Sequence, residues 1–371
     1  MRHSWRIGRA FGIDINIDSS WFLIFILFSW VLAANYYPQG YPGWSQGLYW
    51  FIGVMTSLLI FTSVLIHELA HSIVAIQQGE KVKNITLFIL GGVAQITEEP
   101  KKPLQELLMA LVGPLASFGL GFIFFIVALF LKGTSIPLHA ALSYLALINL
   151  VLGIFNLLPG FPMDGGRVLR SIIWKITGNL RKATRIASRT GQGFAFLLMV
   201  LGGVQVIRGY LSGLWLIFIG WFLHSAAVRG YRRVMVETVL KGVSAGDLMT
   251  KDYESVRHDL LVQELVDDFI LKKRERVFLV LEEEEVRGIV CLEDVKATPR
   301  ERWSEYRVED IMTPREKLMF VSLEADGSEI LDSLTANDIH QIPVLKQGRI
   351  VGIICRSDVL RFIQLRSELG V

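Results

Sequence analysis

The chain has 371 residues, of which 52% are hydrophobic, and a mean hydropathy of +0.44, which excludes an ordinary soluble protein and a single domain. Residues 1–240 carry 19 basic and 9 acidic side chains, whereas residues 241–371 carry 19 and 26. The first part is therefore typical of a membrane region with basic loops, and the second of a mildly acidic soluble domain. No basic patch with interleaved aromatic residues indicates nucleic-acid binding. The two cysteines, Cys291 and Cys355, favour a reducing compartment.

Long apolar runs predict about six transmembrane helices, because a helix needs about 20 mostly apolar residues to cross a bilayer. The runs are residues 20–37, 48–77, 105–131, 138–161, 191–207 and 212–229. Lysine and arginine gather at the N-terminus and in every second loop, so the positive-inside rule predicts a multi-pass protein of a cell membrane with both termini cytoplasmic.

Residues 82–98, VKNITLFILGGVAQITE, lie between the second and third predicted helices. Two β-rich runs flank Gly91 and Gly92, which predicts a β-hairpin. Its apolar content predicts that it enters the membrane under cover of protein. The fold class expected for this region is a polytopic α-helical membrane protein with a short membrane-associated β-hairpin.

The second predicted helix contains the pattern HELAH at residues 67–71. His67 and His71 are four residues apart, so they share one helix face and can hold one metal ion, with Glu68 in reach of a metal-bound water. Zinc in a catalytic site takes three protein ligands and leaves one position open. The alternative is two packed histidines and a glutamate that reaches the interface. A charged side chain at mid-bilayer costs about 2.5–3.5 kcal/mol, which favours the metal site.

The third ligand is expected from FNLLPGFPMDGG, residues 155–166, where the fourth predicted helix ends. Asp164 lies there at a depth similar to that of His67. The neighbouring prolines and glycines break the helix and let the carboxylate turn inward. The alternative is that Asp164 caps the next helix. Asn156, two turns earlier, either donates a hydrogen bond to substrate or binds a neighbouring helix.

Together, the two motifs resemble the site-2 proteases, the intramembrane zinc metalloproteases, over roughly residues 1–230. The resemblance implies one zinc ion per chain, held by His67, His71 and Asp164, with Glu68 as catalytic base. It also implies that the substrate is a single-span membrane protein. GPLAS, residues 113–117, resembles the third-span motif of that family, in which an asparagine commonly stands at the position of Ser117, so no role is predicted for Ser117.

The soluble part contains an internal repeat, because AGDLMT (245–250) and RGIVCLEDV (287–295) recur as VEDIMT (308–313) and VGIICRSDV (351–359). Paired copies of this length resemble tandem CBS domains. The resemblance implies an α/β unit with one domain at 244–300 and another at 307–366. We expect it to follow a membrane domain at 1–230 and a linker at 231–243, and the charges of the loops predict that it is cytoplasmic.

CBS pairs commonly bind adenine nucleotides, and the resemblance places Asp294 and Asp358 at the ribose hydroxyls. Cys291 and Cys355 stand where serine or threonine is usual, and a thiol is a poor hydrogen-bond donor. Two alternatives remain open, namely a module that only preserves the fold and forms a homodimer, and a thiol-redox switch.

The function predicted is an intramembrane zinc endopeptidase that cleaves transmembrane segments and is modulated by nucleotide binding to the CBS pair. The first alternative is a CBS-regulated ion transporter or channel with an intramembrane metal site. Such proteins usually consist of two repeated halves, and residues 1–230 contain no repeat. The second alternative is a membrane-anchored ligand sensor with an inert metal site.

Overall fold

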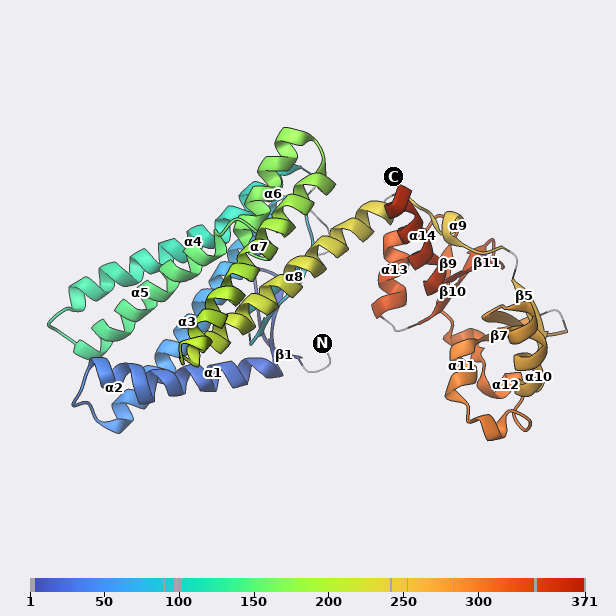
Figure 1. Cartoon of the computed structure of the whole chain (residues 1–371), viewed down its shortest axis with the longest axis horizontal. Coiled ribbons are helices and arrows are strands. Elements are labelled where there is room, and N and C mark those ends of the chain that lie inside the picture. The colour runs from blue at the N-terminus through green and yellow to red at the C-terminus, as the bar shows by residue number, and fades with distance from the viewer. Residues whose placement is uncertain are drawn as a thin grey trace. The chain divides into compact units, whose positions relative to one another are not determined.

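The computed structural model describes residues 4–89, 91–96, 100, 102–240, 242–251, 253–283, 285–336 and 339–369. The chain divides into two compact units, Met1–Val234 and Met235–Val371 (Figure 1). Within the described residues, six helices are long and apolar enough to cross a membrane, which confirms the predicted polytopic class.

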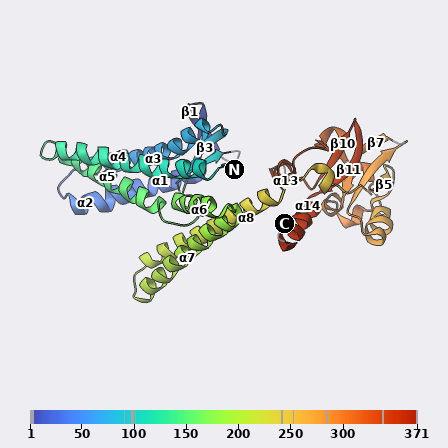
Figure 2. The ribbon, with the colours of Figure 1, turned by 90° about the horizontal axis from the view of Figure 1, so that it is seen from above.

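The first of these spans consists of α1 (Ser19–Val31), a π-helical turn (Leu32–Tyr36) and α2 (Tyr37–Gly40). The others are α3 (Gln46–Gln77), α4 (Pro103–Leu131), α5 (Ile136–Asn156), α7 (Leu180–Ile207) and α8 (Ser212–Leu240). α4 packs against both α3 and α5, and α7 and α8 run alongside each other (Figure 2).

Three boundaries differ from the sequence expectation. The fourth span ends at Asn156, and an additional helix, α6 (Asp164–Thr177), follows it. α7 begins at Leu180, where the side chain of Asn179 caps the helix. The sequence predicted a start at residue 191, because the first three turns of α7 are too polar to belong to an apolar run. α8 continues to Leu240, so most of the expected linker is helical.

The predicted hairpin is part of a larger sheet. β1 (Ser4–Ala10), β2 (Ile13–Asp18), β3 (Val82–Phe88) and β4 (Gly91–Ile96) lie in the order β1-β2-β3-β4. β2 runs parallel to β3, and the other two pairs are antiparallel. Alternate residues of β2 are buried, and Ile17 packs with Trp21 of α1 and Phe61 of α3. This packing holds the sheet against the helices, with β4 as an edge strand.

The second unit contains two sheets that repeat one motif. β5 (Glu254–Arg257), β6 (Val277–Glu282), β7 (Glu285–Cys291) and β8 (Thr313–Pro314) form one sheet, and β9 (Val321–Ser322), β10 (Gln341–Lys346) and β11 (Arg349–Cys355) form the other. The β6–β7 and β10–β11 hairpins have the same register: Phe278 opposes Val290, and Ile342 opposes Ile354 at corresponding positions. The sequence repeat is therefore a structural repeat.

Short helices complete each copy. They are α9 (Ala245–Leu248), α10 (Val262–Glu264) with a π-helical continuation (Leu265–Leu271), α11 (Leu292–Ala297), α12 (Val308–Ile311), α13 (Gly327–Ala336) and α14 (Arg356–Leu369). Val239 and Leu240 at the end of α8 belong to this unit, where Leu240 joins the core of the second copy and Arg366 donates to the carbonyl of Val239.

Tyr37→Phe should lower the stability of the membrane unit. The Tyr37 side chain is fully buried, and its hydroxyl lies 2.8 Å from Oγ1 of Thr56 on α3. Loss of this hydrogen bond should cost about 1 kcal/mol, a fall of about 2–4 °C in melting temperature in detergent. Tyr36→Phe, at an exposed neighbour, is the control. Equal melting of the two variants would contradict the expectation.

Candidate metal centre

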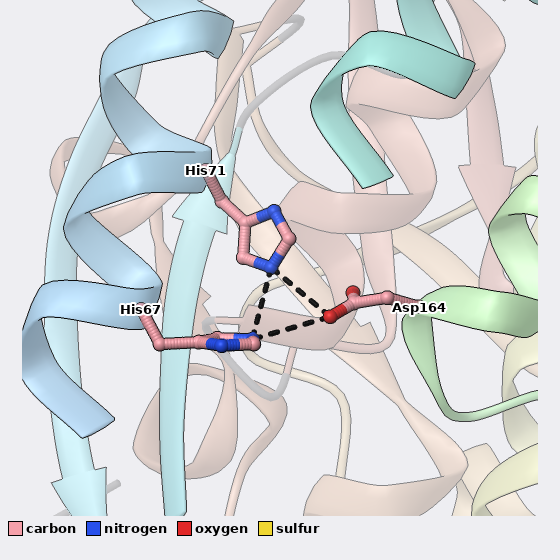
Figure 3. A group of neighbouring side chains, drawn as sticks. All are labelled: His67, His71 and Asp164. Atoms are coloured by element: carbon pink, nitrogen blue, oxygen red, sulfur yellow. Dashed lines mark hydrogen bonds and ion pairs between the residues drawn. The ribbon is translucent and has the colours of Figure 1, made fainter. Parts of the chain in front are cut away.

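Two histidines and one aspartate converge between α3 and the start of α6 (Figure 3). The Nε2 atoms of His67 and His71 lie 3.2 Å apart, and Oδ2 of Asp164 lies 3.2 Å from the first and 3.1 Å from the second. Within the described residues, this is the one group of three or more His, Cys, Asp and Glu side chains that could hold a metal ion. The structure thus brings together residues that are almost a hundred positions apart.

The other ring nitrogen of each histidine has a partner on α4. Nδ1 of His71 donates to the carbonyl of Met109 at 2.6 Å, and Nδ1 of His67 lies 2.9 Å from Oγ of Ser117. A hydrogen on Nδ1 leaves the Nε2 lone pair free to face a metal ion, as in metal sites whose ligands are oriented by outer partners. Sequence reasoning assigned no role to Ser117. The available signal was a polar residue four positions after Gly113 in an apolar helix.

Gly113 makes room at the centre. A Cβ atom added to it would lie 2.1 Å from Nε2 of His71 and 2.7 Å from Nε2 of His67. The missing side chain therefore leaves a space beside the Nε2 atoms of both histidines. Two imidazole nitrogens and one carboxylate oxygen are a ligand set that suits zinc, so the residues present fit this ion.

Glu68 follows His67 on α3 and faces strand β4. The main chain of Ala94 hydrogen-bonds to its carboxylate, and a Cβ added to Gly92 would lie 2.5 Å from Cγ of Glu68. The glutamate is not one of the three converging ligands. It is therefore beside the ligand group and against the free edge of the sheet.

The start of α6 determines where Asp164 points. The N-cap residue is Met163, and no side chain caps the helix, so the alternative that Asp164 serves as a cap is wrong. A Cβ added to Gly165 would lie 2.2 Å from the carbonyl oxygen of Leu157. Glycine at this position lets the start of the helix press against the turn before it, with the carboxylate directed to the histidines.

Asn156 is the last residue of α5 and is partly buried. Among the described residues, its side chain makes no hydrogen bond, so the interhelical bond considered for it is not found there.

The two aspartates of the soluble unit have different surroundings. Asp358 lines a cavity of about 480 Å³ together with Arg274, Arg276 and Arg361. The carboxylate of Asp294 accepts hydrogen bonds from the backbone N–H of Cys291 at 2.8 Å and from its thiol at 3.0 Å, and the carboxylate of Asp358 likewise bonds to the thiol of Cys355. Asp294 is therefore the third residue of a capping box whose N-cap residue is Cys291, at the start of α11.

The two thiols are poorly suited to redox chemistry. Burial, with a contribution from Asp294, raises the pKa of Cys291 to about 12. Burial and Asp358 raise the pKa of Cys355 to about 12 as well. Both groups stay protonated at neutral pH, and because the thiolate is the reactive form, this argues against a thiol switch.

Comparison with known proteins identifies both parts of the chain. The family model described as peptidase family M50 matches residues 55–140 and 133–200, and the CBS domain model matches residues 245–299 and 308–365. The zinc metalloprotease MJ0392 of Methanocaldococcus jannaschii is 34% identical over 372 residues, which cover 100% of this chain and 99% of the relative. The Synechocystis relative sll0528, which also carries a zinc metalloprotease name, is 34% identical and covers 98% and 96%.

The chain belongs to peptidase family M50. It is a zinc metalloprotease, a hydrolase of peptide bonds, that carries tandem CBS domains. Among solved structures, the chain is similar to the site-2 protease from Methanocaldococcus jannaschii, with 33% identity, coverage of 61% of this chain and 94% of that chain, and a TM-score of 0.42. Membership in this family answers the choice between protease and transporter that the sequence left open.

Gly113→Ala should abolish zinc binding by this M50 protease. The added methyl group would occupy the space between the imidazole nitrogens, so affinity should fall by more than about 100-fold, beyond the usual effect of changing an outer partner. Elemental analysis of the purified, detergent-solubilised variant measures this. Gly119→Ala, on the same helix and facing open space, is the control and should keep its zinc. Full zinc content in Gly113→Ala would refute the proposed position of the ion.

Proposed function

We propose that this M50 protease cleaves single-span membrane proteins within their transmembrane segments, with one zinc ion held by His67, His71 and Asp164. The observation that carries the proposal is the convergence of these three ligand atoms in a bundle of helices apolar enough to span a bilayer. Both histidines are about 95% buried, at 4% and 5% exposure, so the substrate bond must reach a site inside the bundle.

The residues of the chain divide the chemistry between them. Zinc, when bound, supplies the Lewis acidity that activates a water molecule and polarises a carbonyl. Glu68 takes a proton from the attacking water and passes it to the leaving amine. Met109 and Ser117 keep the two imidazoles in orientation through their Nδ1 atoms. We assign to Asn156 a hydrogen bond to the substrate backbone.

Glu68→Gln should remove cleavage and leave zinc in place, because the amide cannot accept the proton and the residue is not a ligand. The rate should fall about 10²–10⁴-fold. The assay is cleavage of a purified single-span substrate in detergent or liposomes, together with elemental analysis. Asp164→Asn is the complementary variant and should lose zinc as well as cleavage. Cleavage by Glu68→Gln at the rate of the parent protein would rule out the mechanism, and an unchanged zinc content in Asp164→Asn would rule out the ligand set.

The edge strand β4 is the proposed docking place for the substrate chain. A helical substrate hides its peptide bonds, so a segment must unwind before it can be cut. An extended segment can add to a free sheet edge through main-chain hydrogen bonds. Two contacts support β4: the main chain of Ala94 bonds to Glu68, and Gly92 packs against the same side chain.

Ala94→Pro should weaken substrate binding and also lower kcat, because proline distorts this edge and removes the N–H that bonds to the Glu68 carboxylate. KM should rise roughly tenfold, the equivalent of about 1.4 kcal/mol, with zinc content unchanged. Ile7→Pro is the matched control, since Ile7 lies at the bulge of β1 on the opposite edge of the sheet and has no partner in the register. A fall in kcat at constant KM would mean that Ala94 acts only on Glu68. Equal kinetics in the parent protein, Ala94→Pro and Ile7→Pro would rule out substrate docking on β4.

The basic loops support an orientation in which both termini are cytoplasmic, so that the CBS pair faces the cytoplasm. We also propose that the CBS pair forms a homodimer. The molar mass of the detergent-solubilised protein tests whether it is a homodimer.

An adenine nucleotide is the proposed ligand of the CBS pair. The cavity beside Asp358 contains three arginines, and guanidinium groups bind phosphate oxygens through paired hydrogen bonds. The carboxylate of Asp358 is the proposed partner of the ribose hydroxyls. The resemblance to CBS pairs also gives this role to Asp294, but Asp294 is not among the residues that line this cavity, so it is the weaker candidate.

Asp358→Asn should weaken nucleotide binding about tenfold or more, through the loss of charge-assisted hydrogen bonds to the ribose. Thermal-shift titrations with ATP and with AMP measure this in the whole protein. Asp294→Asn is the paired variant and should retain most of the affinity. Absence of binding by the parent protein would favour a module that only preserves the fold and dimerises.

A further inference from the structure

One face of α4 borders the metal centre along the N-terminal half of the helix. Glu106, Met109, Gly113 and Ser117 follow each other at spacings of three or four residues and are all buried, so they form one stripe. Met109 and Ser117 contact the outer nitrogens of the histidines, and Gly113 leaves the central space. Glu106 begins the stripe, but its partner is on α6.

The nearer partner is Arg170, and Nε of Arg167 on the same helix lies 4.0 Å from Oε1 of Glu106. Nε of Arg170 donates to Oε1 of Glu106 at 2.5 Å, and its Nη2 contacts the same oxygen. Glu106 is fully buried, and Arg170 is 4% exposed. The guanidinium of Arg170 also lies over the ring of Phe161, 5.2 Å from its centre, in the turn that precedes Asp164. Arg170 therefore binds both α4 and the segment that leads into the aspartate.

A second arginine reinforces this contact. Arg167 lies one turn after Asp164 and donates from Nη2 to Sδ of Met109 at 3.0 Å. Met109 is the residue whose carbonyl orients His71. The contacts between α4 and α6 are thus made by residues that also touch the ligand shell.

The location of α6 makes these contacts important. α6 has 14 residues, fewer than a helix needs to cross a bilayer, and Asp164 is its first residue, so the packing of α6 on α4 decides where the carboxylate lies. A buried ion pair adds little stability compared with apolar side chains of the same size, but the planar guanidinium restricts distance and angle. The pair is therefore better explained by geometry than by stability.

We propose that Glu106 and Arg170 are positioning residues that set the register of α6 on α4 and so hold Asp164 at the Nε2 atoms of the two histidines. The inference rests on the proposed metal site. It assigns a function to two charged side chains that neither the ligand set nor the catalytic base requires.

The decisive variant is Glu106→Leu combined with Arg170→Met, which removes both charges and keeps the volume. The protein should fold, because apolar replacement of a buried ion pair is often neutral. The affinity for Zn²⁺ should fall about 10–100-fold, as for other changes to the supports of a metal ligand. The visible absorption of the Co²⁺-substituted protein should also change, since it reports the geometry of coordination.

Two further variants distinguish a loss of positioning from a general loss of stability. Tyr37→Phe removes a buried interhelical contact whose partner, Thr56, is 11 residues before His67 on α3, about 16 Å along the helix. It should lower the melting temperature and leave the Zn²⁺ affinity unchanged, which separates destabilisation from positioning. Arg170→Lys keeps the charge without the planar group and should weaken Zn²⁺ binding by several-fold.

Parent-like Zn²⁺ affinity and Co²⁺ absorption in the double variant would overturn the proposal. If the double variant does not fold, Arg170→Lys decides, and unchanged affinity and absorption in that variant would overturn it equally. A parent protein that bound no zinc would refute the metal site itself, an outcome distinct from the failure of the positioning role.

Discussion

The membrane unit is organised around one constraint: two imidazoles and a carboxylate must meet at a point inside an apolar bundle. Buried polar groups without partners are costly, and each of these three has one. His67 and His71 are bound at their outer nitrogens by α4, and Asp164 is directed to their inner nitrogens by the start of α6. α4 thus provides the carbonyl of Met109, the hydroxyl of Ser117 and the open space at Gly113, but no ligand atom.

Close approach of backbones permits this arrangement. A Cβ added to Gly191 of α7 would lie 1.9 Å from the carbonyl oxygen of Phe161, so the turn before Asp164 packs directly on the main chain of α7. The facing glycines Gly202 and Gly213 bring α7 and α8 together in the same way. Apolar burial does not drive helices together in lipid, so small residues at contacts and a few polar bonds set the geometry. The bond between Glu106 and Arg170 is one of these polar bonds.

The soluble unit shows how two copies of one motif acquire different chemistry. Asp294 and Asp358 occupy equivalent positions in the repeat, and both raise the pKa of a neighbouring cysteine. Asp358 lines a cavity with three arginines, whereas Asp294 is not among the residues that line it. The difference comes from the surrounding segments, and it makes the two halves of the CBS pair unequal as ligand sites.

Patterns in the sequence predicted the membrane spans, the repeated domains and the three candidate metal ligands. The length of the apolar runs predicted six spans, the internal repeat predicted the CBS pair, and the i, i+4 spacing of HELAH placed His67 and His71 on one face, because helix periodicity is local. Only the tertiary structure decided the roles of Met109, Gly113 and Ser117 and the addition of β1 and β2 to the predicted hairpin. These features depend on contacts between segments far apart in the chain, whose register is set by packing and leaves no periodic signal in the sequence.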